Sequence, residues 1–278
     1  MVAMKEVIPL TGPFFVAAFR LIPSGLLLVA FAASKGRPIP SGLAAWLSIS
    51  VFALVDAACF QGFLAQGLQR TSAGLGSVII DSQPLTVAVL AYFLFGESIG
   101  FVGALGLALG LVGLLLLEVP TLASDDNFSL WGSGEWWMLL AAQSMAIGTV
   151  MVRWVSQYSD PVMATGWHMV IGGIPLVVVS LLNNDPAFNG SLMQLTANNI
   201  LALLYTSIFG SAISYGLYFY SATKGSLTKL SSLTFLTPMF ASLLGFVYLG
   251  ETFTPLQLVG AVVTVISIYM VNYQESIE

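Results

Sequence analysis

The stretch PLTVAVLAYFLFGE, at residues 84–97, decides the fold because the same pattern of residues recurs at 238–251, where the chain reads PMFASLLGFVYLGE. Both copies begin with proline, continue as an apolar run and end in Gly-Glu. Without a gap, the same alignment places Gly106 on Gly260. Prolines and glycines that recur at a fixed spacing indicate a repeat. The sequence therefore predicts an internal duplication with an offset of 154 residues.

A second alignment, with an offset of 148 residues, relates the beginning of the chain to its second half. It pairs residues 13–20 with residues 161–168, which makes Arg20 and His168 equivalent. In this alignment the segment matching residues 135–148 is missing from the first half. We therefore expect a five-helix repeat whose first helix is largely absent from this chain.

The composition is that of a membrane protein. Of the 278 residues, 57% are hydrophobic and 8% are charged, with a mean hydropathy of +0.92, whereas about a quarter of the residues in a soluble domain are charged. A membrane-spanning helix needs about 20 apolar residues. The sequence predicts an all-α polytopic protein with spans at 13–33, 43–67, 72–95, 99–117, 135–155, 161–182, 200–222, 226–248 and 254–272.

The polar stretch near the centre of the chain separates the two repeats. We expect a first repeat at 1–117, a linker at 118–134 and a second repeat at 135–278. Because five helices per repeat is an odd number, the halves cross the membrane in opposite directions, as in many secondary transporters. Lys and Arg favour the loops that this topology places inside, so both ends of the complete protein, with ten helices, are expected in the cytoplasm.

Several functions are excluded by what the sequence lacks. The net charge of −5 forms no run, which argues against nucleic-acid binding. With Cys59 as the single cysteine and one histidine, no intrachain disulfide or clustered metal site is expected. Phosphate loops, dinucleotide fingerprints and nucleophile elbows do not occur, so we expect no enzyme, metal or cofactor. The Gly-Glu pairs are interpreted as caps of short turns.

These residues carry a resemblance to a known family. The Gly-Glu pairs at 96–97 and 250–251, each after a proline, and Phe19-Arg20 resemble the EamA-type carriers of the drug/metabolite transporter superfamily. Residues 69–84 are especially similar to WAT-related members of photosynthetic bacteria and plant plastids. The resemblance implies ten helices in two inverted repeats, a central cavity, and export or exchange of small metabolites. It favours the bacterial inner (plasma) membrane, with the plastid envelope as the alternative.

Four ionisable residues stand out deep within predicted spans: Arg20, Asp56, Asp81 and His168. Each costs at least about 2.5 kcal/mol near the bilayer centre, so it normally faces a cavity or a partner. At a rise of about 1.5 Å per residue, the first three lie at similar depth. One hypothesis is a static clamp in which Arg20 pairs with Asp56 or Asp81. The other is that one of the two acids exchanges a proton as substrate moves.

Asymmetry between the repeats favours the second hypothesis, because Gly210 and Phe235 are the equivalents of the two acids. His168 either titrates near neutral pH or hydrogen-bonds to a neighbouring helix. Pro84 and Pro238 interrupt backbone hydrogen bonding and are interpreted as hinges, with passive kinks as the alternative. The predicted cavity set is Arg20, Asp56, Gln61, Asp81, Gln83, His168, Tyr215, Tyr218 and Thr237.

The leading hypothesis is a secondary transporter that works by alternating access and exports a small metabolite, such as an amino acid or an amphipathic organic solute. Proton coupling through Asp81 or Asp56 is a further hypothesis. The alternatives are an obligate exchanger or facilitator and, in another class, a non-transporting structural or sensory membrane protein. The expected partners are the lipid bilayer, a small-molecule substrate and, in the coupled hypothesis, protons.

Overall fold

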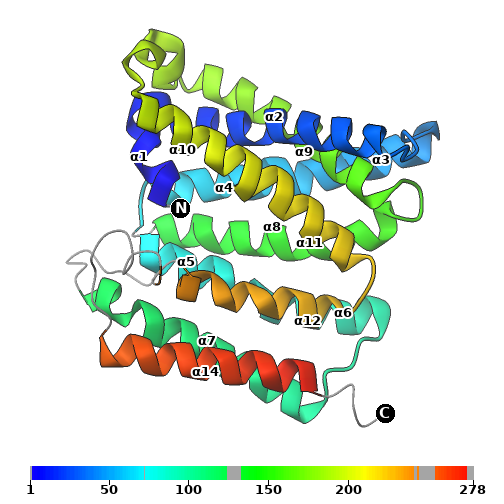
Figure 1. Ribbon diagram of the computed structural model, residues 1–278, viewed down its shortest axis with the longest axis vertical. Coiled ribbons are helices and arrows are strands. Elements are labelled where there is room, and N and C mark those ends of the chain that lie inside the picture. Colours follow the sequence, from blue (N-terminus) through cyan, green and yellow to red (C-terminus); the bar gives the residue numbers. More distant parts are fainter. Residues whose placement is uncertain (1, 72, 124–132, 241–242, 244–253, 274–278) are drawn as a thin grey trace. The chain divides into compact units, whose positions relative to one another are not determined.

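The computed structural model describes residues 2–71, 73–123, 133–240, 243 and 254–273, and all regular elements in these ranges are helices (Figure 1). Eight helical runs are long and apolar enough to cross a membrane, which confirms an all-α, multi-pass membrane protein. The predicted span at 226–248 and the Gly-Glu pair at 250–251 lie partly or wholly outside the described residues. The eight spans are Pro13–Ser34, Gly42–Leu68, Leu75–Phe95, Gly100–Leu117, Gly134–Val155, Pro161–Leu182, Ala197–Ala222 and Pro255–Tyr273.

The chain packs as two units, and each unit takes segments from both halves of the sequence. Unit 1 consists of Met1–Gln69 and Ile147–Lys224, and unit 2 of Arg70–Ala146 and Gly225–Glu278. The repeat boundaries predicted from the sequence follow the order of the chain, whereas the units follow its packing. The division into repeats at 1–117 and 135–278 therefore stays a prediction.

The elements of unit 1 are α1 (Val2–Thr11), α2 (Pro13–Ser34), α3 (Gly42–Phe52), η1 (Ala53–Cys59), α4 (Phe60–Leu68), the C-terminal part of α8 (Ser133–Val155), α9 (Pro161–Leu182), η2 (Pro186–Asn189), η3 (Ser191–Gln194), α10 (Ala197–Ser207), η4 (Ile208–Ile213) and α11 (Ser214–Ala222). Those of unit 2 are α5 (Ala73–Asp81), α6 (Gln83–Phe95), α7 (Gly100–Ala123), the beginning of α8, α12 (Leu227–Ser232), η5 (Leu233–Leu236) and α14 (Pro255–Tyr273).

Within unit 1, α2 and α9 pack together along their length and run antiparallel. A Cβ atom added to Gly25 would lie 2.8 Å from a methyl group of Val170, and one added to Gly173 would lie 2.5 Å from Ile22. Gly25 and Gly173 are equivalent at the 148-residue offset, as are Ile22 and Val170. A contact and its mirror image are the mark of a two-fold relation, here between one helix of each half.

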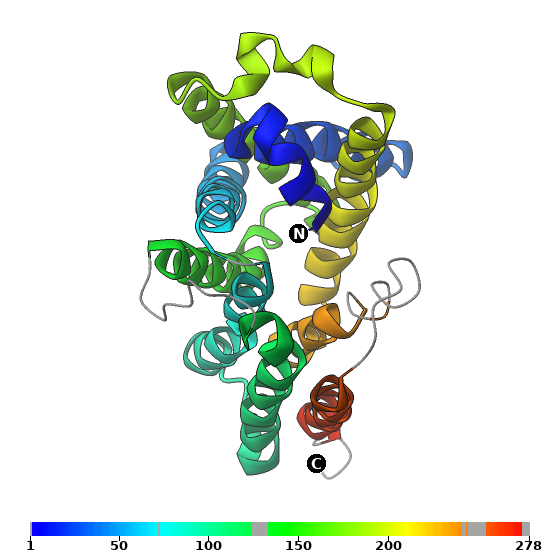
Figure 2. The same cartoon turned by 90° about the vertical axis from the view of Figure 1, so that its left-hand side faces the viewer.

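Unit 2 repeats this arrangement with α7 and α14, which lie side by side in both views (Figures 1 and 2). A Cβ atom on Gly106 would lie 3.0 Å from Cβ of Met270, and one on Gly260 would lie 3.0 Å from Cβ of Leu116. These two contacts exchange at the 154-residue offset. Antiparallel packing of equivalent helices in each unit agrees with the inverted repeats predicted from the sequence.

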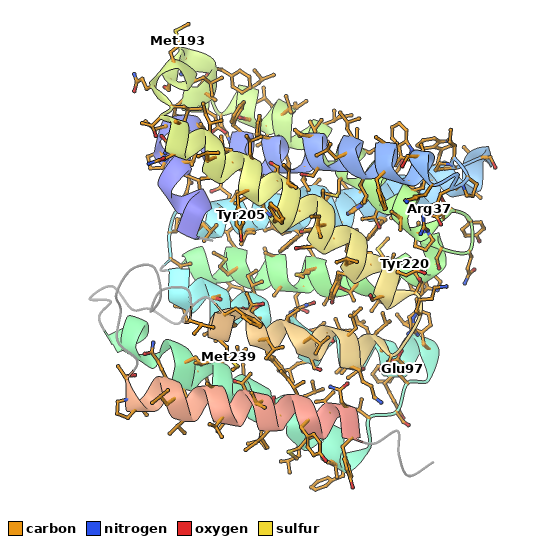
Figure 3. All side chains as sticks on the ribbon, viewed as in Figure 1. Arg37, Glu97, Met193, Tyr205, Tyr220 and Met239 are labelled. Carbon is orange, nitrogen blue, oxygen red and sulfur yellow. The ribbon has the colours of Figure 1, made fainter. Side chains whose placement is uncertain are left out.

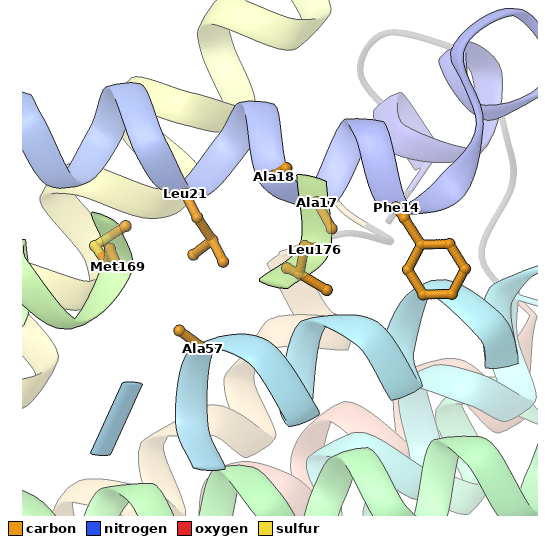
Figure 4. Close-up of a cluster of buried hydrophobic side chains, with 7 residues drawn as sticks. All are labelled: Phe14, Ala17, Ala18, Leu21, Ala57, Met169 and Leu176. Carbon is orange, nitrogen blue, oxygen red and sulfur yellow. The ribbon is translucent and has the colours of Figure 1, made fainter. Parts of the chain in front are cut away.

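A cluster of small and apolar side chains holds the site-bearing elements of unit 1 together (Figure 4). Three of its seven members are alanines. At one of them η1 approaches α9 closely, because a Cβ atom on Gly172 would collide with Ala57 and lie 2.6 Å from the carbonyl oxygen of Ala53. Small residues allow such approach between membrane helices. The cluster consists of Phe14, Ala17, Ala18, Leu21, Ala57, Met169 and Leu176.

Two π-helical segments interrupt the long helices of unit 1. They are η1, at Ala53–Cys59, and η4, at Ile208–Ile213. At the 154-residue offset, η1 maps onto residues 207–213, so the two segments occupy equivalent positions. Single-turn π segments are rare and occur frequently at functional sites. Their recurrence in both halves directs attention to the side chains that they position.

Candidate functional site

Asp56 lies within η1 and faces His168 of α9. Oδ2 of Asp56 is 3.1 Å from Nε2 of the imidazole, and both side chains are 0% exposed. The clamp was expected between Arg20 and either Asp56 or Asp81. In the described structure Asp56 pairs with His168 and not with Arg20, whereas a clamp between Arg20 and Asp81 stays a prediction. Nor do Asp56 and His168 form an exposed cavity wall in this conformation, since packing encloses them.

Aromatic rings and one backbone carbonyl fix the orientation of His168. The ring stacks on Phe52, with centroids 4.1 Å apart and planes at 18°, and meets Phe219 edge-on at 5.6 Å. Nδ1 lies within hydrogen-bond distance of the carbonyl oxygen of Thr165, one turn earlier in α9. The imidazole is thus held on its faces and at both nitrogens.

The backbone of α8 covers the other side of the Asp56 carboxyl group. A Cβ atom on Gly148 would collide with Asp56, so only glycine permits this approach. In the described part of the chain, no group donates a hydrogen bond to Oδ1 of Asp56, although this atom is buried. A buried oxygen without a donor is an unusual feature that calls for an explanation.

A second polar group lies where equivalent residues of the two halves meet. Nε2 of Gln61 donates a hydrogen bond to Oη of Tyr215 at 2.8 Å, and Nη1 of Arg20 donates to Oε1 of Gln61 at 3.5 Å. Gln61 and Tyr215 are equivalent at the 154-residue offset, so this bond lies on the local two-fold axis of unit 1. Nearby, Tyr218 bonds to Thr149 at 3.3 Å.

The exposure of these side chains separates two layers. Asp56 and His168 are fully enclosed, whereas Arg20 is 8% exposed and Tyr215 and Tyr218 are partly exposed. The first layer is a buried pair of a carboxyl group and an imidazole, and the second combines a guanidinium, an amide and two phenols. We call the group of Arg20, Gln61, Tyr215 and Tyr218 the axis cluster.

In unit 2, Asp81 closes α5 and accepts a hydrogen bond from Ser77 at 3.1 Å. The helix is interrupted at Ser82, and Pro84 lies in the first turn of α6. The proline thus lies just after an interruption within the span Leu75–Phe95. The role of Pro84 and Pro238 as hinges stays a prediction; η5, a 3-10 segment, ends two residues before Pro238.

The remaining two candidates of unit 2 differ in exposure. Gln83 is 1% exposed, and its amide has no hydrogen-bond partner among the residues described. Thr237, by contrast, is exposed. Gln83 is thus a buried amide with unused donors and acceptors, whereas Thr237 requires no partner within the protein.

The Gly-Glu pair at 96–97 caps a local turn, as expected, because the backbone nitrogens of Gly96 and Glu97 donate to carbonyl oxygens of the last turn of α6. The Glu97 side chain has a further role. Gly96 ends α6 in the left-handed region, with φ of 67°. The Glu97 carboxylate accepts hydrogen bonds from Oγ of Ser226 at 2.9 Å and from the backbone nitrogen of Leu227 at 3.1 Å. It therefore caps the beginning of α12, a helix from the other half of the chain, where a negative charge is favoured.

A pocket of about 570 Å³ in unit 1 lies apart from both layers. It is apolar and is formed by α2, η4 and α11, with Arg37 and Tyr220 at one end (Figure 3). Arg37 there binds Asp160 at 2.7 Å. None of the candidate residues predicted from the sequence lines this pocket.

The sequence profile of the EamA-like transporter family matches residues 1–119 and 132–273. The chain belongs to this family. It is 79% identical over 276 residues to a chloroplastic WAT1-related protein of Arabidopsis thaliana, covering 99% of this chain and 66% of that protein. It is also 48% identical to an uncharacterized transporter of Synechocystis, covering 100% of this chain and 87% of the relative. By their names, the family and this relative are transporters and not enzymes.

A solved crystal structure shares the fold of this EamA protein, with a TM-score of 0.80 and 16% identity, covering 98% of this chain and 91% of that one. The structure of the EamA chain brings together six of the nine predicted residues in unit 1 and places Asp81, Gln83 and Thr237 in unit 2. Sequence reasoning missed the roles of Gly148 and Glu97. Each Gly-Glu pair lies at the same distance after its proline, and this repetition was a signal that Glu97 matters. Nothing in the sequence indicated which helix Glu97 would contact.

Proposed function

We propose that the protein is a secondary carrier that works by alternating access and binds its solute at the axis cluster. One observation carries this proposal: Gln61 and Tyr215, equivalent residues of two inverted repeats, bond to each other beside two π-helical segments. In carriers built from inverted repeats, the solute binds at the interface between repeats, where helices are interrupted. The axis cluster meets both conditions within unit 1.

The chemistry of the axis cluster favours a small solute that carries a carboxylate and an apolar part. The guanidinium of Arg20 has a geometry suited to two parallel hydrogen bonds with a carboxylate. Gln61 supplies an amide, while Tyr215 and Tyr218 supply hydroxyl groups on aromatic rings. Amino acids and small amphipathic organic acids fit this combination.

Export is the proposed direction, and proton coupling through Asp56 or Asp81 is part of the proposal. Obligate exchange is the alternative, in which counter-substrate and not a proton gradient sets the rate. The chloroplastic relative supports the plastid envelope as the location, and the cyanobacterial relative supports a bacterial plasma membrane. A non-transporting structural protein would have no use for equivalent polar residues enclosed between its repeats.

Flux in proteoliposomes tests the proposal. The purified chain is reconstituted, vesicles are loaded with one unlabelled amino acid or small organic acid, and counterflow of the labelled compound is measured across a panel. We expect counterflow of at least one carboxylate solute, and its loss in Arg20→Gln. The matched control is Lys224→Gln, which removes an exposed cation that lies over the ring of Tyr220.

Two results would count against this function. Absence of counterflow for every member of the panel, in protein that is folded and correctly inserted, would contradict a carrier of such solutes. Equal flux in the wild type and Arg20→Gln would remove the axis cluster from the binding site. Retained flux in Lys224→Gln is required for the comparison, because it shows that loss of any positive charge is not sufficient.

A further inference from the structure

The imidazole of His168 lies between two hydrogen-bond acceptors. The carbonyl oxygen of Thr165 lies at Nδ1, and the carboxyl group of Asp56 lies at Nε2. A carbonyl oxygen only accepts, so Nδ1 must carry the hydrogen in that contact. A neutral imidazole has a single N–H, and the contact with Thr165 uses it.

The second contact then requires one more proton. With Nδ1 protonated, Nε2 and Oδ2 at 3.1 Å form a hydrogen bond only if a proton lies on one of them. It resides either on Nε2, giving an imidazolium beside a carboxylate, or on Asp56, giving a carboxylic acid beside a neutral ring. Without this proton, two lone pairs face each other in a site that excludes water.

We propose that Asp56 and His168 together bind one proton, which they share, and that this pair is the coupling-ion site of the carrier. The inference rests on the proposed transport function and assigns its coupling to one pair of atoms, Oδ2 and Nε2. Binding converts the pair from a net charge of −1 to zero: the proton enters from water and leaves to water, and no other bond changes.

Aromatic rings and backbone enclose the pair. Among ionisable side chains of the elements packed around it, Tyr215 on α11 interacts electrostatically with Asp56. Arg20 on α2 hydrogen-bonds to Gln61, and Tyr218 contacts Phe219. The faces of the ring contact Phe52 and Phe219, and the backbone of α8 at Gly148 covers the carboxyl group.

Loss of the proton leaves a net negative charge in this enclosure, with Oδ1 still lacking a donor in the described structure. An uncompensated buried charge is costly. The deprotonated pair therefore favours conformations in which water or the guanidinium of Arg20 reaches the carboxylate. This preference links the proton to the opening of unit 1, which is what coupling requires.

The single histidine makes the proton directly observable. Protein labelled with 15N-histidine, purified with an affinity tag free of histidine, gives imidazole nitrogen signals from His168 alone. We expect a protonated Nδ1 and an Nε2 that is either protonated or strongly hydrogen-bonded. In Asp56→Asn, whose amide N–H donates to Nε2, we expect a neutral ring that keeps Nδ1–H and no longer changes with pH.

Two spectra would overturn the proposal. One is a neutral ring with the hydrogen on Nε2 throughout, because the pair then needs no extra proton. The other is a wild-type ring whose nitrogen signals change with pH in the same way as those of Asp56→Asn. Both readings use the folded protein and do not depend on finding the solute.

Transport measurements distinguish failure of this proposal from failure of the proposed carrier function. In Asp56→Asn and His168→Gln, we expect counterflow to continue while accumulation driven by a pH gradient falls to the level measured without a gradient. Asp81→Asn is the comparison, since Asp81 is the other acid of the coupling hypothesis and is also buried. Loss of gradient-driven accumulation in Asp81→Asn alone would overturn the assignment, whereas absence of wild-type counterflow would contradict the carrier function itself.

Discussion

Gln61 and Tyr215 occupy the same position in the two halves of the chain and bond to each other, with 2.8 Å between Nε2 and Oη. Equivalent residues meet only on the two-fold axis that relates the repeats. The bond therefore marks the axis of unit 1 with two side chains that differ in chemistry. The internal duplication explains the symmetric packing of the helices. At this one equivalent position the two halves differ, and the resulting amide and phenol place polar groups on the axis.

Removing the hydroxyl group from this centre tests its structural value. Tyr215→Phe leaves the buried amide of Gln61 without its acceptor, and we expect a loss of about 1 to 2 kcal/mol in unfolding free energy. Thermal unfolding in detergent measures the change. Tyr205→Phe is the matched control because Tyr205 is 58% exposed, and equal losses in both variants would contradict a special role for the axis bond.

The approach of α8 to Asp56 gives a second prediction. In Gly148→Ala the new methyl group collides with the carboxyl group, and overpacking of this kind costs about 1 to 3 kcal/mol. We expect a lower unfolding midpoint and an altered 15N signal of His168, since Asp56 is displaced. Gly210→Ala is the control, because its nearest neighbour, Cβ of Thr206, is 3.9 Å away. A tolerated alanine at 148 would refute the close contact.

The cap that Glu97 forms on α12 gives a third prediction. Glu97→Ala removes a carboxylate that accepts hydrogen bonds from Ser226 and Leu227, and loss of a helix cap costs about 0.5 to 2 kcal/mol. We expect faster hydrogen exchange at residues 227–232, with Glu97→Gln intermediate because its amide oxygen still accepts. Exchange that is unchanged in Glu97→Ala would show that α12 does not depend on this cap.

The mirrored contacts between α7 and α14 give a fourth prediction. Gly106→Val and Gly260→Val each insert side-chain atoms at a 3.0 Å contact, so we expect similar losses of about 1 to 3 kcal/mol. Ala104→Val, on an exposed position of α7, is the control. A large loss in one glycine variant and none in the other would contradict the symmetric packing.

Much of the frame could be predicted from the sequence. The offsets of 148 and 154 residues relate glycines that mirror each other across antiparallel helices, such as Gly25 with Gly173 and Gly106 with Gly260. Glycines and prolines mark close approaches and helix ends, and their spacing survives when other residues diverge. The all-α class and the inverted repeats followed from that spacing and from hydropathy.

The partners of the buried charges could not be predicted in the same way. Depth along a regular helix suggested that Arg20 meets Asp56 or Asp81. For Asp56, however, η1 is a π segment, and its wider turn changes the face on which this residue lies. The carboxyl group consequently faces His168. For Glu97, local turn chemistry predicted the cap at the end of α6. It could not predict the partners of the carboxylate, because they lie about 130 residues away in the chain.

The central claim is that the axis cluster binds a carboxylate solute, and equilibrium binding tests it most directly. Once counterflow identifies a transported solute, its affinity for the purified wild type, Arg20→Gln and Lys224→Gln is measured in detergent. Loss of a charged hydrogen-bond partner weakens binding by about 10-fold or more, and we expect that loss in Arg20→Gln alone. Equal affinity in the wild type and Arg20→Gln would contradict the account.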